Sequence, residues 1–171
     1  QKGLAMRSIC QRRCPVVGSG GLVIGYGSPL RGDDYAGQAA AARLRQWRMV
    51  GVQVIARAQL TPELAAVIAQ ARRVVFLDAA VDRTDVDVRV IEPALTLNGS
   101  HQSDPPALLA LARVLYGRVP RAVLITIPAY DTTLNLSLSP ATERAVARAA
   151  RFARAFLGRR YQSLQERAVG Q

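Results

Sequence analysis

Residues 22–37, LVIGYGSPLRGDDYAG, constrain the fold more than any other part of this sequence. The first three of them are apolar and mostly β-branched, which predicts a buried strand. A glycine-rich turn follows, and residues 36–44 then form an alanine-rich run of high helix propensity. A strand, a glycine-rich turn and a helix in this order predict a parallel α/β sheet with a site at the carboxyl end of the strand.

The charges in the turn argue against a nucleotide-binding loop. A dinucleotide fingerprint needs a third glycine where this chain has Leu30, and a P-loop needs Lys and Ser or Thr where it has Asp33 and Asp34. We expect Asp33 to cap the following helix, because its carboxylate can accept hydrogen bonds from the first backbone N–H groups. Asp34 is then a free carboxylate at the mouth of a site, which suggests a metal ion or a proton as its partner.

Strand and helix patterns alternate along the rest of the chain. Further strands are predicted at about residues 52–56, 73–80, 87–92 and 122–127, and helices at about 34–49, 61–71, 104–116 and 139–157. This alternation predicts a three-layer α/β/α sandwich around a mostly parallel sheet of about five strands. We expect a basic, disordered extension over residues 1–20, one α/β domain over 21–158 and a polar tail over 159–171.

The net charge of the chain bears on its partner. The formal net charge is +11, which taken alone favours nucleic acid or another acidic partner. The arginines are dispersed, however, and aromatic residues that could stack on bases make up 5% of the chain. The arginines that come closest to forming a basic stripe lie on one face of the last predicted helix. We interpret this face as solvated, and we expect no nucleic-acid partner. That face carries Arg144, Arg148, Arg151 and Arg154.

The segment ahead of the first strand contains both cysteines, Cys10 and Cys14. A zinc site needs about four ligands, and no second Cys or His pair accompanies them, so we expect free thiols. No apolar run approaches the roughly 18 residues of a membrane span, and the first twenty residues lack the apolar core of a signal peptide. We therefore expect a cytoplasmic monomer that does not bind a membrane.

Two further residues join Asp34 at the predicted site. Asp78 closes the most continuously apolar strand, where a buried carboxylate is costly unless it is paired, hydrogen-bonded or coordinated. His101, the one histidine of the chain, precedes a predicted helix at the same edge of the sheet. Right-handed crossovers place the ends of the first and third strands at that edge, so both carboxylates should face one crevice. Two carboxylates and an imidazole suit Ni²⁺ or Zn²⁺.

Residues 25–34, GYGSPLRGDD, resemble the G-x-G-N-x-L-x-x-D-D/E signature of the nickel–iron hydrogenase maturation proteases. The resemblance covers roughly residues 21–157, with two departures: Ser28 replaces the usual Asn, and Tyr35 stands where a small residue is common. Beyond the signature it runs through QLTPEL at 59–64, VFLDA at 75–79, His101 with PPALL at 105–109, and LSP at 138–140.

This resemblance implies an endopeptidase that removes the C-terminal extension of a hydrogenase large-subunit precursor after nickel insertion. It implies a phosphorylase/hydrolase-like sandwich and a metal-dependent, aspartic-type hydrolase in which Asp34, Asp78 and His101 are the metal-contacting and catalytic residues. The nickel would be carried by the substrate, and Zn²⁺ or Cd²⁺ could occupy the same site. The partner would be the large-subunit precursor.

Other interpretations stay open on the sequence alone. Tyr35 is bulky enough to fill the crevice, which would leave a partner-binding protein of the same fold without catalysis. The net charge keeps open a basic nucleic-acid-binding module. Asp78 could cap a nearby loop, and His101 could be an ordinary loop residue. Asp33, if it is not fully used as a cap, is the candidate general base.

Overall fold

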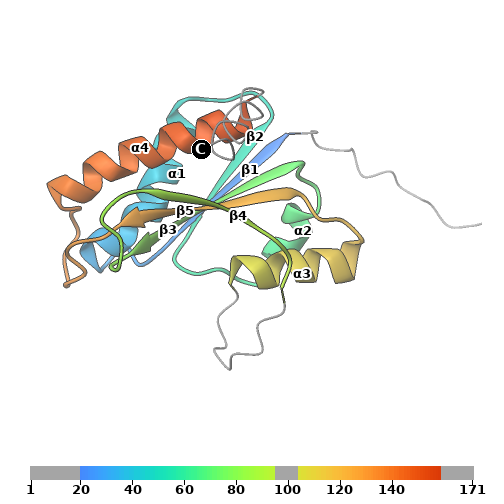
Figure 1. Cartoon of the computed structure of the whole chain (residues 1–171), viewed down its shortest axis with the longest axis horizontal. Helices are drawn as coiled ribbons and strands as arrows, with labels where there is room; N and C mark the ends of the chain where they lie inside the picture. The colour runs from blue at the N-terminus through green and yellow to red at the C-terminus, as the bar shows by residue number, and fades with distance from the viewer. Residues whose placement is uncertain (1–19, 95–103, 159–171) are drawn as a thin grey trace, which may run out of the picture.

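The computed structural model describes residues 20–94 and 104–158. Five strands form one sheet (Figure 1), and they are β1 (Gly21–Tyr26), β2 (Val52–Arg57), β3 (Arg73–Ala80), β4 (Asp87–Ile91) and β5 (Arg121–Pro128). Their order across the sheet is β2-β1-β3-β5-β4. The first three pairings in that order are parallel, and β4 runs antiparallel to β5 at one edge. The predicted sheet is therefore confirmed.

The helices cover both faces of this sheet, which confirms the three layers. They are α1 (Ala36–Gln46), α2 (Leu64–Ile68), α3 (Pro105–Tyr116) and α4 (Pro140–Leu157), with a 3-10 turn, η1 (Gly32–Tyr35), before α1. Helices α1 and α4 lie on one face, and α2 and α3 lie on the other (Figure 1). The described residues contain no helix that is long and apolar enough to cross a membrane.

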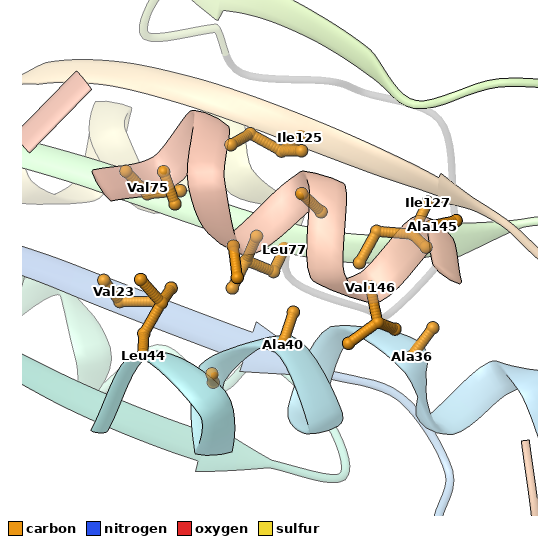
Figure 2. Close-up of a cluster of buried hydrophobic side chains, with 14 of the residues drawn as sticks. Val23, Ala36, Ala40, Leu44, Val75, Leu77, Ile125, Ile127, Ala145 and Val146 are labelled. Carbon is orange, nitrogen blue, oxygen red and sulfur yellow. The ribbon is translucent and has the colours of Figure 1, made fainter. Parts of the chain in front are cut away.

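The layer under α1 and α4 is the larger of the two apolar cores. Figure 2 shows Val23, Leu77 and Ile125 from three strands meeting Leu44 of α1 and Val146 of α4. All five side chains are buried, and burying one of this size contributes about 1.5–3 kcal/mol. The helix side of this layer is otherwise largely alanine, so both helices approach the sheet closely. The buried alanines are Ala36, Ala40, Ala41, Ala145, Ala149, Ala150 and Ala153.

Several helix boundaries differ from the predicted ones. Helix α1 begins at Ala36 and not near residue 34, because the four preceding residues form η1. Helix α2 has five residues, and Thr61 provides no side-chain cap for it. Side chains cap the other two helices: Asp104 accepts a hydrogen bond from Ala107 N (2.7 Å), and Ser139 Oγ accepts one from Thr142 N (3.3 Å).

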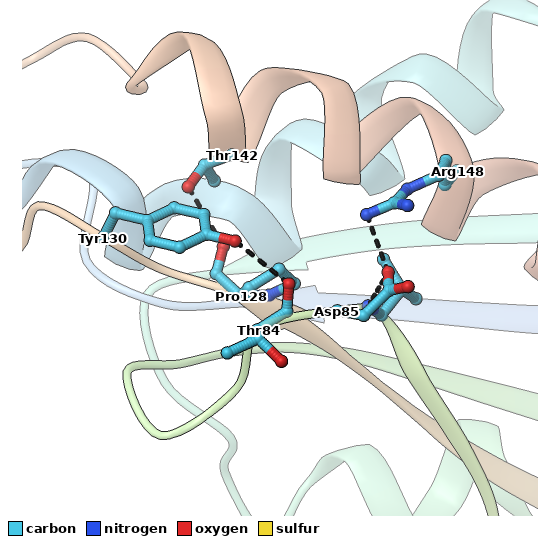
Figure 3. A network of polar contacts seen from close by, with 7 residues as sticks. Thr84, Asp85, Pro128, Tyr130, Thr142 and Arg148 are labelled. Atoms are coloured by element: carbon cyan, nitrogen blue, oxygen red, sulfur yellow. Dashed lines mark hydrogen bonds and ion pairs between the residues drawn. The ribbon is translucent and has the colours of Figure 1, made fainter.

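The arginine face of α4 is less solvated than predicted. Arg148 forms an ion pair with Asp85 (2.7 Å between Nη2 and Oδ1), which Figure 3 shows. The Arg154 guanidinium lies 5.4 Å from the centre of the Trp47 ring. Two of the four arginines thus contact other elements of the fold, where such exposed pairs contribute at most about 1 kcal/mol each.

The amino ends of the parallel strands lie at the edge of the sheet where the described chain begins and ends. Arg72 N donates a hydrogen bond to the carbonyl of Gly20 (3.1 Å). The guanidinium of the next residue, Arg73, donates to the carbonyls of Leu157 (3.1 Å) and Gly158 (3.2 Å). Two adjacent arginines therefore hold both ends of this domain. The rest of the predicted extension, with Cys10 and Cys14, and the predicted tail lie outside the described residues.

Candidate functional site

The two aspartates predicted for the site lie at the carboxyl ends of adjacent parallel strands. Asp34 belongs to η1, which follows β1, and Asp78 lies near the end of β3. Strand β1 pairs directly with β3, and both carboxylates line one cavity of about 480 Å³. The predicted shared crevice is therefore present. The assignment of these residues as catalytic and metal-contacting stays a prediction.

The turn after β1 positions the Asp34 carboxylate. Its Oδ2 accepts a hydrogen bond from the backbone N–H of Ser28 (2.8 Å). Ser28 also stabilises the turn through its hydroxyl, which accepts a hydrogen bond from Leu30 N (3.3 Å). Although Ser28 replaces the usual Asn of the signature, a side chain at this position still hydrogen-bonds within the turn. Asp34 Oδ1 accepts no hydrogen bond from the described residues. One oxygen is thus held by the protein, and the other is available to a ligand.

Two glycines allow this turn to pack closely. Gly27 has a φ of +131°, and a Cβ at this position would collide with the backbone carbonyl of Asp34. Gly37, at the start of α1, lies against the backbone carbonyls of Tyr26 and Leu77, so a side chain there would push α1 away from β1 and β3. The distance between the helix and the sheet, and with it the place of Asp34, depends on both glycines.

Asp78 is partly buried near the end of β3. Its Oδ1 accepts a hydrogen bond from Ala79 N (2.9 Å), and the Tyr26 hydroxyl also hydrogen-bonds to this carboxylate. Burial raises the pKa of Asp78, and the nearby charge of Asp34 acts in the same direction, while the two hydrogen bonds oppose the shift. The protein thus destabilises the charged form of Asp78, so this carboxylate is stabilised when it binds a cation or a proton.

Tyr26 is a site residue that the sequence analysis missed. Burial, and then the charge of Asp78, raise the pKa of its hydroxyl, so the phenol stays protonated and can donate to the carboxylate. The signal was present, because Tyr26 ends the buried strand at the predicted site.

Tyr35, which the sequence analysis suspected of filling the crevice, lines none of the described cavities at this edge.

A second cavity adjoins the first. It has a volume of about 610 Å³ and shares Tyr26, Leu60 and Asp78 with the 480 Å³ cavity. Ala94 and Asp104 also line it, and these are the two residues that flank segment 95–103. His101 belongs to that segment and lies outside the described residues. Within the described ranges, no group of three or more His, Cys, Asp or Glu side chains could hold a metal ion.

Asp33 does not cap the following helix, which corrects the sequence-based expectation. Its side chain is fully buried, and its two oxygens accept hydrogen bonds from five donors. These donors are the backbone N–H groups of Tyr130 (2.8 Å), Asp131 (2.9 Å) and Ser139 (2.6 Å) and the hydroxyls of Ser139 (2.8 Å) and Thr142 (2.7 Å). Asp33 therefore joins the turn after β1 to loop 129–139 and to the start of α4.

The same contacts exclude Asp33 as a general base. Burial raises the pKa of Asp33, but the hydrogen bonds outweigh this effect and hold the pKa at about 2. The largest of them comes from Ser139 N, followed by the Thr142 hydroxyl and then the N–H groups of Asp131 and Tyr130. The Thr142 hydroxyl also lies 3.0 Å from the carbonyl of Pro128, and the Tyr130 hydroxyl donates to Thr84 O at 3.1 Å (Figure 3). Asp33 is thus the centre of a structural network and has no open oxygen for substrate.

Comparison with known sequences leaves the family unassigned. No protein-family model matches the chain, and no curated protein matches it significantly. Solved structures do match. A NiFe hydrogenase maturation protease, HycI, from Thermococcus kodakarensis superposes with a TM-score of 0.64 at 22% identity, over 81% of this chain and 92% of that one.

Two other solved structures give the same result. The hydrogenase maturating endopeptidase HybD from E. coli matches with a TM-score of 0.63 at 21% identity, over 78% of this chain and 88% of that one. A hydrogenase 2 maturation peptidase from a Thaumarchaeota archaeon matches with a TM-score of 0.60 at 23% identity, over 81% and 98% of the two chains. Across most of its length, this chain has the fold of the NiFe hydrogenase maturation proteases.

Proposed function

We propose that this protein is an endopeptidase that removes the C-terminal extension of a nickel–iron hydrogenase large-subunit precursor. The observation that carries the proposal is the convergence of Asp34 and Asp78 on one cavity. This convergence occurs in a chain whose fold is that of hydrogenase maturation proteases. The motif at residues 25–34, which resembles the signature of that family, supplies the turn that positions Asp34.

The proposed third residue is His101. Asp104 lines the second cavity, which shares Asp78 with the first. His101 is three positions before Asp104, and three Cα–Cα steps span at most about 11 Å. This reach supports an imidazole contribution to the site. Two carboxylates and one imidazole form a donor set that fits a divalent ion such as Ni²⁺.

In the proposed reaction the nickel arrives as part of the substrate. Asp34 offers its free Oδ1, and Asp78 offers a carboxylate whose burial favours binding of a cation. Their binding of the nickel would hold the precursor with its scissile peptide at a fixed distance from the cavity. A metal ion in this position can polarise a carbonyl or activate a water molecule.

The test is cleavage of a purified nickel-loaded precursor, followed by mass spectrometry of the large subunit. We expect the wild type to release one C-terminal peptide and to leave the nickel-free precursor intact. Asp78→Ala and His101→Ala should each abolish release. Asp82→Ala, which removes an exposed carboxylate after β3, is the matched control and should cleave normally.

Two results would contradict parts of this proposal. If Asp78→Ala and His101→Ala both cleave at the wild-type rate, the site assignment is wrong. If the wild type binds the nickel-loaded precursor but never cleaves it, the protein is a partner-binding member of the same fold.

A further inference from the structure

Four arginines meet at the amino edge of the sheet, opposite the edge that holds Asp34 and Asp78. They line one cavity of about 350 Å³, a volume within the range of small-molecule binding sites. The other lining residues are Ala71, Val119 and Pro120, so in the described part of the chain every charged side chain of this lining is cationic. We call this feature the arginine cavity, and its arginines are Arg72, Arg73, Arg118 and Arg121.

The pairing of the strands brings these arginines together. Residues 73 and 121 are register partners at the first positions of the adjacent parallel strands β3 and β5. Such partners lie about 5 Å apart and direct their side chains to the same face of the sheet. The backbone N–H of Arg121 also donates to the carbonyl of Arg72 (3.1 Å). Arg118 follows Gly117, the left-handed residue (φ +66°) that ends α3 four positions before β5 begins.

Three of the four guanidinium groups have no protein partner in the described chain. Arg73 donates to backbone carbonyls at the end of α4. Across residues 20–94 and 104–158, the exposed side chains of Arg72, Arg118 and Arg121 form no ion pair and no hydrogen bond. Glu92 follows β4 close to the start of β5, but it lines the 610 Å³ cavity and forms no ion pair with Arg121. The positive charge of the arginine cavity is therefore left for a ligand to neutralise.

The flanking segments of this sequence do not supply that ligand. Residues 1–19 contain no Asp or Glu, and their four basic residues are Lys2, Arg7, Arg12 and Arg13. Residues 159–171 contain one acidic residue, Glu166, and the three arginines Arg159, Arg160 and Arg167. A second copy of the chain carries the same net charge of +11, so overall repulsion disfavours it. These charges favour a separate anion as the occupant.

The lining favours a small phosphate anion over other anions. Guanidinium groups form paired hydrogen bonds with the oxygens of phosphates and carboxylates. A carboxylate offers two coplanar oxygens, whereas the tetrahedral groups of a diphosphate present oxygens in several directions, which suits arginines that come from different segments. No aromatic side chain among the described residues lines this cavity to stack on a base, which makes a nucleic acid the weaker fit.

We propose that the arginine cavity binds a diphosphate or triphosphate anion. Arg72, Arg118 and Arg121 hold the anion with their guanidinium groups, and Arg73 adds charge while it stays bound to the end of α4. This binding does not depend on the proposed function, because the arginine cavity and the two aspartates of the candidate site lie at opposite edges of the sheet.

The experiment is a calorimetric titration of the full-length chain with inorganic pyrophosphate at constant ionic strength. Arg118→Gln with Arg121→Gln is the cavity variant, and it removes two of the three guanidinium groups that have no described partner. Arg144→Gln with Arg151→Gln is the matched control, because it removes the same charge from exposed positions of α4 outside the arginine cavity. Thermal unfolding without pyrophosphate checks that both variants fold, and Arg118→Gln alone replaces a cavity variant that does not.

We expect the wild type to bind one pyrophosphate and the cavity variant to bind it at least about tenfold more weakly, since a lost charge-assisted hydrogen bond costs about that factor. The control variant should stay within about twofold of wild type. Pyrophosphate should also raise the Tm of the wild type and of the control variant, because a ligand that binds the folded state stabilises it. The Tm of the cavity variant should change little.

Four results would overturn this proposal and leave the proposed function standing. One is a wild type that binds no pyrophosphate at about 10 mM. Another is equal weakening in the cavity and control variants, which would assign the binding to overall charge. Citrate that binds as tightly as pyrophosphate would assign the cavity to carboxylates. A single-stranded RNA that binds more tightly than pyrophosphate, and that the cavity variant no longer binds, would assign the cavity to a nucleic acid.

Discussion

Asp33 and Asp34 are adjacent and chemically identical, yet the fold uses them in opposite ways. Asp33 is fully buried and its oxygens accept five hydrogen bonds, all from residues 130–142. Among the described residues, Asp34 accepts one hydrogen bond, from Ser28 in its own turn, and it faces a cavity. The second carboxylate can be left open because the first one fixes the turn that both share.

The largest effect should come from breaking the buried half of this pair. Asp33→Ala leaves the N–H groups of Tyr130, Asp131 and Ser139 without their acceptor, and we expect the free energy of unfolding to fall by about 4 kcal/mol. Urea unfolding monitored by circular dichroism measures this loss. A variant as stable as wild type would show that other groups can replace the carboxylate.

The open half of the pair should affect activity instead of stability. We expect Asp34→Asn to change the free energy of unfolding by less than about 1 kcal/mol, because one backbone hydrogen bond is at stake. Under the proposed function, processing of the nickel-loaded precursor should fall by more than about a hundredfold, equivalent to about 2.8 kcal/mol. Equal stability losses in Asp33→Asn and Asp34→Asn would contradict the division of roles.

Acid should reveal the same contrast. The pKa of Asp33 is about 2, below its ordinary value of 3.8, so its contribution to stability is present above about pH 4 and is lost as the pH falls towards 2. This shift corresponds to about 2 kcal/mol. The stability difference between wild type and Asp33→Asn should therefore shrink by that amount when urea unfolding is repeated at about pH 2. A difference independent of pH would show that the Asp33 pKa is normal.

The smallest expected effect concerns Tyr26 at the open site. Tyr26→Phe removes the hydroxyl that hydrogen-bonds to Asp78 and keeps the ring between the two cavities. Under the proposed function, in which Asp78 binds nickel, we expect processing to fall about tenfold, as is usual when a group that orients a metal-binding side chain is lost. The readout is a changed nickel dependence of cleavage at unchanged thermal stability. Tyr116→Phe, a change on the exposed end of α3, is the control.

The sheet could be predicted because β1, β3 and β5 contain continuous apolar runs and the edge strands β2 and β4 alternate polar and apolar residues. The shared cavity could be predicted because parallel strands bring Asp34 and Asp78 to one edge. The function of Asp33 could not be predicted. All five of its hydrogen bonds come from donors at least 97 positions away in the sequence. The local sequence pattern instead favoured a role for Asp33 as the cap of the helix that follows it. Thr61-Pro62-Glu63 likewise has a helix-start pattern, yet five residues of α2 suffice to bury Leu64, Ala65 and Ile68. For His101, which lies outside the described residues, the prediction stays a prediction.

The two adjacent arginines at the start of β3, Arg72 just before the strand and Arg73 as its first residue, have a practical consequence for measurement. Because Arg72 and Arg73 bind the carbonyls of Gly20 and Gly158, both ends of the described domain lie at the amino edge of the sheet. The cavity lined by Asp34 and Asp78 lies at the carboxyl edge. Immobilisation near either end of the described domain would therefore turn the carboxyl edge, with its cavity, outward. A sensor surface prepared in this way should bind a partner as large as a folded precursor without steric interference from its support.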